Sequence, residues 1–158
     1  MEYQKLYKEG VEALMQVNIA EASLDARLLL EAVCGTDHNT LLSHGDDPVD
    51  DGKCVEYREL IKKRSERIPV AYLLSSCEFM GLDFFVSEDV LIPNQDTETL
   101  TEEALRYVHD GMHILDLCTG SGCIALSLLR YTNETTASTE TIAICAAFGS
   151  PVMLSTDE

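Results

Sequence analysis

The chain has 158 residues, of which 28 are acidic and 11 basic, so its formal net charge is −17 and its pI is near 4.4. This length suits one ordinary domain or two small ones, and a hydrophobic content of 46% is enough to build a core. Such an acidic surface excludes non-specific binding of nucleic acid or anionic membranes by the whole surface, but leaves room for a local basic patch. The start of the chain lacks a signal-peptide pattern and no apolar run approaches membrane-spanning length, so we expect a cytoplasmic protein.

Six cysteines are spread over the chain. None of them forms a Cys-x-x-Cys pair or has a histidine at ligand spacing. We therefore expect reduced thiols that behave as small hydrophobic side chains, and no metal site. The four histidines are equally scattered, and we assign them no chemistry.

The first half of the chain carries apolar residues at helical spacing. The pattern predicts five helices, at residues 3–17, at 23–33, around Leu41 and Leu42, at about 53–66, and at 70–74. Asp37 or Asn39 is the expected N-cap of the third helix, and Gly35 the C-terminal cap of the second. In the second helix we predict a buried stripe of Leu24, Leu28, Leu29 and Ala32.

The predicted helix at 53–66 and the residue after it hold six of the eleven bases, which are Lys53, Arg58, Lys62, Lys63, Arg64 and Arg67. Two interpretations stay open. The cluster is either a patch that faces a protein partner or RNA, or a solvated helix face. We favour the solvated face, because cations near a helix C-terminus are stabilised by the helix dipole.

From Cys77 the apolar period changes from helical to alternating. This predicts a hairpin that turns at Gly81, includes residues 90–92 and ends at Pro93. The next helix is expected to begin at an Asp96 or Thr97 cap. Its predicted buried face consists of Leu100, Ala104, Leu105 and Val108. A strand at 112–116, a nearly all-apolar helix at about 121–130 and a second buried strand at 142–148 complete the predicted elements.

The stretch 114–125 reads as a buried strand, a tight turn and the start of a helix. Gly120 and Gly122 let the backbone turn sharply, and the following helix N-terminus directs free N–H groups at the turn, which suits a nucleotide-like cofactor. No lysine follows these glycines, which excludes a P-loop. A dinucleotide loop would tolerate Ala125 in place of its third glycine. The strand-end acid Asp116 favours S-adenosylmethionine, because its carboxylate can hold the loop or the cofactor's amino group.

The chain resembles the glutamine-amide methyltransferases of the HemK or PrmC type, which modify peptide-chain release factors. The resemblance covers roughly residues 1–137. It is carried in the family's order by the segments 25–30, 67–73, 78–84, 90–93, 96–98 and 115–125.

This resemblance implies a fold that is α+β and then α/β. An N-terminal helical substrate-recognition bundle (1–74) is followed by a short β-hairpin linker (75–95) and an incomplete Rossmann-like methyltransferase domain (96–158). It implies S-adenosylmethionine as cofactor and peptide-chain release factors as partners, with no membrane association and no direct binding of nucleic acid. The implied cofactor residues are Asp116, Cys118, Thr119, Gly120, Ser121 and Gly122, with Glu140 as candidate for the ribose hydroxyls.

The chain also departs from the family pattern. Ser75 stands where the family usually has glycine, Asn94 where it has arginine, and Cys118 where it has the first loop glycine. The Asn-Pro-Pro-Tyr motif, whose asparagine and proline carbonyl hold the substrate amide, is absent. From about Ser138 the resemblance stops, as in a frameshifted or prematurely ended reading frame. We therefore name no catalytic residue and expect a C-terminally truncated methyltransferase with little or no activity.

Two other functions compete with this interpretation. The first is a non-catalytic helical module in which residues 1–74 dock a translation factor. The second is a nucleic-acid methyltransferase, because related enzymes of that class use the same kind of cofactor loop and an Asn-Pro-Pro-Tyr motif. The acidic composition and the resemblance of the helical region argue against the second.

Overall fold

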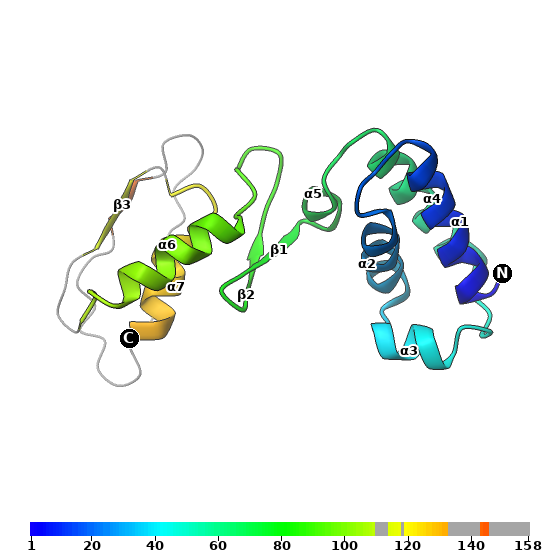
Figure 1. The fold of residues 1–158 in the computed structure, drawn as a ribbon, viewed down its shortest axis with the longest axis horizontal. Coiled ribbons are helices and arrows are strands. Elements are labelled where there is room, and N and C mark those ends of the chain that lie inside the picture. The colour runs from blue at the N-terminus through cyan, green and yellow to red at the C-terminus, as the bar shows by residue number, and fades with distance from the viewer. Residues whose placement is uncertain (110–113, 118, 133–142, 146–158) are drawn as a thin grey trace. The chain divides into compact units, whose positions relative to one another are not determined.

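A computed structural model describes residues 1–109, 114–117, 119–132 and 143–145. The chain divides into two compact units, Met1–Leu74 and Ser75–Glu158, here called the helical unit and the mixed unit. The helical unit contains α1 (Tyr3–Gln16), α2 (Ala22–Cys34), α3 (His38–Ser43), α4 (Asp51–Ser65) and α5 (Val70–Leu74) (Figure 1). The mixed unit contains β1 (Ser76–Phe79), β2 (Leu82–Phe85), α6 (Gln95–Leu105), β3 (Leu115–Leu117), α7 (Cys123–Thr132) and β4 (Ala143–Cys145).

The ends of the helices in the helical unit follow from local capping. The Asp37 carboxylate accepts a hydrogen bond from Thr40 N at 2.8 Å and so caps α3. Asp50 caps α4 by accepting from Gly52 N at 2.9 Å. Gly35 ends α2 in the left-handed conformation, with φ of +63°. The predicted helices and the Gly35 cap are thereby confirmed, and Asp37 is the N-cap rather than Asn39.

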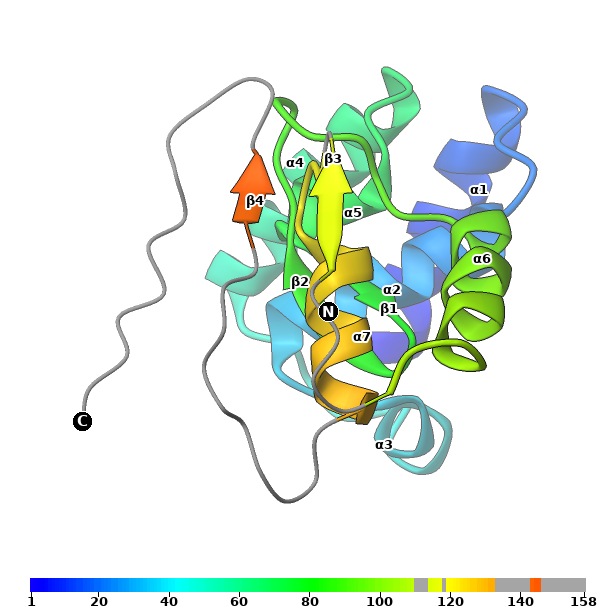
Figure 2. The same cartoon turned by 90° about the vertical axis from the view of Figure 1, so that its left-hand side faces the viewer.

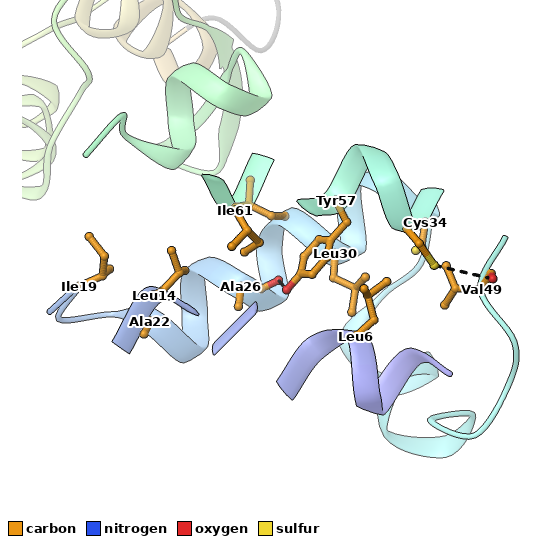
Figure 3. Close-up of a cluster of buried hydrophobic side chains, with 12 residues drawn as sticks. Leu6, Leu14, Ile19, Ala22, Ala26, Leu30, Cys34, Val49, Tyr57 and Ile61 are labelled. Atoms are coloured by element: carbon orange, nitrogen blue, oxygen red, sulfur yellow. Dashed lines mark hydrogen bonds between the residues drawn. The ribbon is translucent and has the colours of Figure 1, made fainter. Parts of the chain in front are cut away.

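The core of the helical unit lies between α1, α2 and α4 (Figure 3). Its centre is Tyr57 on α4, which is fully buried and donates a hydrogen bond from its hydroxyl to Ala26 O on α2 at 3.2 Å. Gly10 on α1 faces this ring, and a Cβ placed there would lie 1.9 Å from Tyr57 Oη. Glycine is therefore required at this position by the close approach of α1 to α4.

The buried stripe of α2 differs from the predicted one. Leu24 is 41% exposed and Ala32 is also exposed, whereas Leu29 is buried as predicted. The stripe instead consists of Ala22, Asp25, Ala26, Leu29, Leu30 and Cys34. The reason is an ion pair, because Arg64 Nε on α4 donates to Asp25 Oδ2 at 2.7 Å and lets a carboxylate occupy the buried face.

In the mixed unit, β1 and β2 form an antiparallel hairpin in which Phe79 pairs with Leu82. Met80 and Gly81 form its two-residue turn with φ of +52° and +71°, as tight hairpins require. The predicted hairpin at Gly81 is confirmed, but it ends at Phe85. Residues 90–92 belong to no strand, and Leu91 is 82% exposed.

Two helices hold this hairpin turn through the backbone of one residue, Met80. Glu98 Oε1 on α6 accepts a hydrogen bond from Met80 N at 2.7 Å, and Tyr131 on α7 donates its hydroxyl hydrogen to Met80 O. On the hairpin face, Phe79 and Phe84 make an edge-to-face contact with ring centroids 6.1 Å apart, and both belong to a small core with Cys123. The hairpin is thus fixed to both of the described helices of the mixed unit, α6 and α7.

The start of α6 also differs from the prediction. Its N-cap is Asn94, whose Oδ1 accepts from Thr97 N at 3.0 Å, so neither Asp96 nor Thr97 is the cap. The helix ends at Leu105, before Val108. Its fully buried residue is Thr101, whereas Leu100 is 60% exposed.

The strands β3 and β4 pair in parallel, with Leu115 opposite Ala143 (Figure 2). The architecture is therefore a helical bundle followed by a mixed unit with a two-stranded antiparallel sheet and one described parallel strand pair. The incomplete Rossmann-like methyltransferase domain and the predicted domain limits at 74, 95 and 158 stay predictions. Within the described residues, no helix combines the length and apolar character needed to cross a membrane.

Candidate cofactor loop

The loop between β3 and α7 is a tight turn built on two glycines. Gly122 N donates to Thr119 O at 2.9 Å, which closes the turn, and Leu126 N donates to Gly122 O at 2.9 Å, which starts α7. Gly120 and Gly122 have φ of +57° and +80°. Residues with a Cβ are strained in this region, so the backbone conformation alone explains both glycines.

Asp116 at the end of β3 is tied to this turn. Thr119 Oγ1 donates a hydrogen bond to Asp116 Oδ2 at 2.9 Å, and Thr119 is only 8% exposed. The second carboxylate oxygen, Oδ1, has no hydrogen bond to any described residue. Asp116 therefore fixes the loop with one oxygen, and no donor among the described residues occupies the other.

Open space lies above the turn. A Cβ placed on Gly120 would have no atom within 4 Å, whereas one on Gly122 would meet Leu126 Cδ1 at 3.4 Å. Ser121 Oγ is buried beside the Cys123 thiol and lowers the pKa of that thiol.

Cys123 begins α7 directly after the turn and is buried against the hairpin aromatic residues. Burial raises the pKa of the Cys123 thiol, and the neighbouring Ser121 hydroxyl opposes this only in part. The thiol therefore stays protonated and acts as a packing group rather than as a nucleophile. Within the described residues, no group of acidic, histidine and cysteine side chains could hold a metal ion.

The structure thus brings five of the seven predicted site residues into one turn, which are Asp116, Thr119, Gly120, Ser121 and Gly122. The other two, Cys118 and Glu140, lie outside the described residues. Sequence reasoning did not identify the two residues that fix the hairpin beside α7. Glu98 lies in a segment that carries the family resemblance, but nothing in the sequence signals the contact of Tyr131 with a residue 51 positions earlier.

The basic cluster of α4 is largely committed to contacts inside the helical unit. Arg58 forms a two-pronged ion pair with Glu9 on α1, at 2.6 and 2.9 Å. Lys53 donates to the carbonyl of Cys34, Arg64 to Asp25, and Arg67 to the carbonyl of Val17. Lys62 and Lys63 make no ion pair within the described residues. Three of these six cations, Lys53, Arg58 and Arg64, tie α4 to α1 and α2, which leaves fewer of them for a nucleic acid.

Comparison with known proteins covers both units. Residues 5–74 match the PrmC N-terminal domain family. The release factor glutamine methyltransferase of Escherichia coli K12 is 40% identical over 130 residues, which are 81% of this chain and 46% of that protein. The enzyme of Geobacter sulfurreducens with the same name is 39% identical over 117 residues, or 74% of this chain and 41% of that protein.

This chain is a relative of the release factor glutamine methyltransferases. The resemblance predicted from the sequence is thereby confirmed. A third relative of this name, from Bordetella pertussis, is 44% identical over 107 residues, or 66% of this chain and 40% of that protein. The chain spans less than half the length of these relatives.

The candidate loop lies inside the part that is similar to the relatives. The match to the E. coli release factor glutamine methyltransferase covers 81% of the 158 residues, or about 128 of them. An aligned stretch of that length includes residues 31–128 wherever it begins. The similarity therefore extends beyond the helical unit and through Asp116–Gly122.

Proposed function

We propose that this chain contains the substrate-recognition domain and the first part of the cofactor site of a protein glutamine methyltransferase. The cofactor would be S-adenosylmethionine and the partner a peptide-chain release factor. The observation that carries the proposal is the Asp116–Thr119 hydrogen bond across a turn of two left-handed glycines, within the region similar to the relatives.

The loop has three features that suit this cofactor. Asp116 Oδ1 can accept a hydrogen bond from the amino group of the methionine part. The bare backbone of Gly120 allows close approach, because no side chain stands over it. The N-terminus of α7 places backbone N–H groups and a positive dipole end at the turn, where they can hold the cofactor's carboxylate.

When bound, S-adenosylmethionine supplies an electrophilic methyl group on a sulfonium. The loop residues would orient that group but would not activate the acceptor. An amide nitrogen is a weak nucleophile, so its reaction depends on positioning and on polar contacts to the amide. The four prolines of this chain are never adjacent, so an Asn-Pro-Pro-Tyr clamp is not available. We therefore propose that this chain by itself has little or no methyltransferase turnover.

A second candidate function is a non-catalytic module that docks a translation factor through the helical unit. It is favoured by the family match, whose extent of residues 5–74 coincides with one compact unit. Methylation of nucleic acid is the less favoured alternative, because the chain carries a net charge of −17 and most cations of α4 are bound to the protein itself.

Isothermal titration of the full chain with S-adenosylmethionine tests the cofactor proposal. We expect measurable binding that Asp116→Asn weakens about tenfold, since a hydrogen bond to a charged group contributes about 1.5–3 kcal/mol. Asp83→Asn is the matched control, because it removes the same charge from an exposed position on β2. Equal affinity of the two variants, or no binding by the unaltered chain, would contradict the proposal.

A parallel assay separates the two candidate functions. The full chain is immobilised and incubated with a peptide-chain release factor, and tritiated S-adenosylmethionine is then added. Retention of the release factor together with cofactor binding supports the methyltransferase-derived site. Retention without cofactor binding supports the docking module, and efficient transfer of tritium would disprove the expected lack of turnover.

A further inference from the structure

The helical unit contains a pocket of about 380 Å³ between α1, α2 and the segment that includes α3. This volume lies near the lower end of the range of about 300–1,000 Å³ that is usual for ligand sites. Its walls combine the aromatic side chains of Tyr3 and Tyr7 with the aliphatic side chains of Leu41 and Leu42. The pocket is formed by residues of the helical unit, whereas the cofactor loop belongs to the mixed unit.

The pocket is preformed, because its walls are joined by hydrogen bonds. The N-terminus of α1 is bound to the segment after α3 through Tyr3 N to Asp47 O at 3.2 Å and Gln4 N to Gly45 O at 2.9 Å. The Tyr7 hydroxyl donates to Ser23 O at 3.2 Å. An occupant therefore would not have to order the backbone around it, which lowers the entropic cost of binding.

The charges at the pocket are opposite to those of the chain as a whole. Lys8 and His38 line the pocket, are exposed, and form no ion pair with any described residue. Arg27 uses Nη1 to bind Glu31 at 3.1 Å, which leaves its other N–H groups available. The acidic residue of the lining is Asp46. Burial raises the pKa of Tyr3, so this phenol stays neutral.

These contacts limit the kind of occupant. A single negative charge matches the lining, because Glu31 already offsets part of the Arg27 charge and Asp46 would repel a dianion. Leu42 is 72% exposed at the pocket and can contact an apolar neighbour of that charge. A long nucleic acid is disfavoured by the net charge of −17.

We propose that this pocket docks a segment of a protein partner in which a carboxylate side chain is flanked by apolar residues. Lys8 and Arg27 would bind the carboxylate, and the tyrosine rings with Leu42 would contact the apolar neighbours. The docking site rests on the helical unit alone. It therefore does not depend on cofactor binding or on methyl transfer.

Amide chemical shifts of the full chain, labelled with 15N, measure this binding. The probe is the peptide acetyl-Leu-Glu-Leu-amide, and its neutral counterpart is acetyl-Leu-Gln-Leu-amide. We expect shifts concentrated at Tyr3, Tyr7 and Leu42, and an affinity at least about threefold higher for the glutamate peptide, as for a partly exposed charge pair. Equal affinities, or shifts elsewhere, would overturn the proposal. Inorganic phosphate that binds more tightly than the peptide would make this a phosphate site and would overturn it too.

Two lysine substitutions provide a matched comparison. Lys8→Gln removes a charge at the pocket, and Lys62→Gln removes the same charge from an exposed position on α4. We expect Lys8→Gln to weaken the glutamate peptide about threefold and to leave the glutamine peptide unchanged, whereas Lys62→Gln affects neither. Both residues are exposed, so both variants should fold. Identical affinities of the two variants for the glutamate peptide would refute the docking site.

Discussion

The contact between Gly10 and Tyr57 provides a sharp test of the packing of the helical unit. In Gly10→Ala the new methyl group would lie 1.9 Å from Tyr57 Oη and 2.8 Å from Cζ, with Ile61 Cδ1 at 3.1 Å. Tyr57 is fully buried and cannot turn into solvent. The ring must therefore shift, and its hydrogen bond to Ala26 O must lengthen or break.

The expected magnitude follows from three contributions. Overpacking a core costs about 1–3 kcal/mol, and a contact this short belongs at the upper end. Loss of the Tyr57 hydrogen bond adds about 1 kcal/mol. Alanine stabilises a helix by about 1 kcal/mol relative to glycine, which opposes the other two. Gly10→Ala should therefore lower the free energy of unfolding by about 3 kcal/mol.

Tyr57→Phe identifies the cause, because it removes the oxygen that the new methyl group would meet. Alone it should cost about 1 kcal/mol. The double variant Gly10→Ala/Tyr57→Phe should lose well under the sum of the two single losses in free energy of unfolding, with a coupling energy of about 2 kcal/mol. Gly35→Ala is the control, since it costs about 1 kcal/mol through its φ of +63° but has no atom within 4 Å, and should be additive with Tyr57→Phe.

Urea unfolding followed by far-ultraviolet circular dichroism measures these values on the full chain. The helical signal is suitable because the chain contains no tryptophan. Two results would contradict the close approach of α1 to α4. Either Gly10→Ala is as stable as the unaltered protein, or Tyr57→Phe does not reduce the destabilisation caused by Gly10→Ala.

Three further predictions concern charge and backbone strain. Asp25→Asn should lower the free energy of unfolding by about 2 kcal/mol in the same urea assay, because it leaves the half-buried Arg64 without its charged partner. The hydrogen bond from Arg58 lowers the pKa of Glu9, so this pair should stabilise the fold above pH 4.5 and lose its effect as the pH falls through the lowered pKa. Between pH 3 and 7, the free energy of unfolding of Glu9→Gln should be lower than that of the unaltered protein by under about 1 kcal/mol, and this difference should vanish at the acid end. Ser75 has φ of +53°, so Ser75→Gly should raise the melting temperature through a gain of about 0.5–1 kcal/mol, and a decrease would contradict the strain.

Features that depend on neighbours in the sequence could be predicted. The Gly35 cap, the Gly81 turn and the two loop glycines follow from conformations that disfavour a Cβ. The hydrogen bond at the centre of the candidate site is equally local, because Thr119 donates it to Asp116, only three residues earlier. The family resemblance likewise depended on short segments, and comparison with known proteins bore it out.

Features set by distant partners could not be predicted. The α2 stripe includes Asp25 because Arg64, 39 residues later, neutralises it, and a periodic pattern treats every carboxylate as exposed. The cap of α6 was misplaced because Asn94, Asp96 and Thr97 can all cap a helix, and only the direction in which the chain enters selects one of them.

Ser75 and Asn94 acquire physical meaning from the structure. Ser75 occupies a left-handed conformation that glycine adopts without strain, which agrees with the glycine that the resemblance implies there. Asn94 caps α6 through its side-chain oxygen, a bond that arginine, which has no acceptor in its side chain, cannot make. Asn94 therefore provides a helix cap at a position where the resemblance implies a cation.

The hydrogen bond of Tyr131 to the hairpin turn has a mechanical consequence for the candidate loop. α7 is a rod about 15 Å long, at 1.5 Å per residue. Its first residue, Cys123, packs on Phe79 and Phe84, and its penultimate residue, Tyr131, is anchored at Met80. A rod fastened at both ends to one hairpin cannot tilt independently of it. The position of the Gly120–Gly122 turn, at the head of that rod, is therefore set by the hairpin as much as by the strand that precedes it.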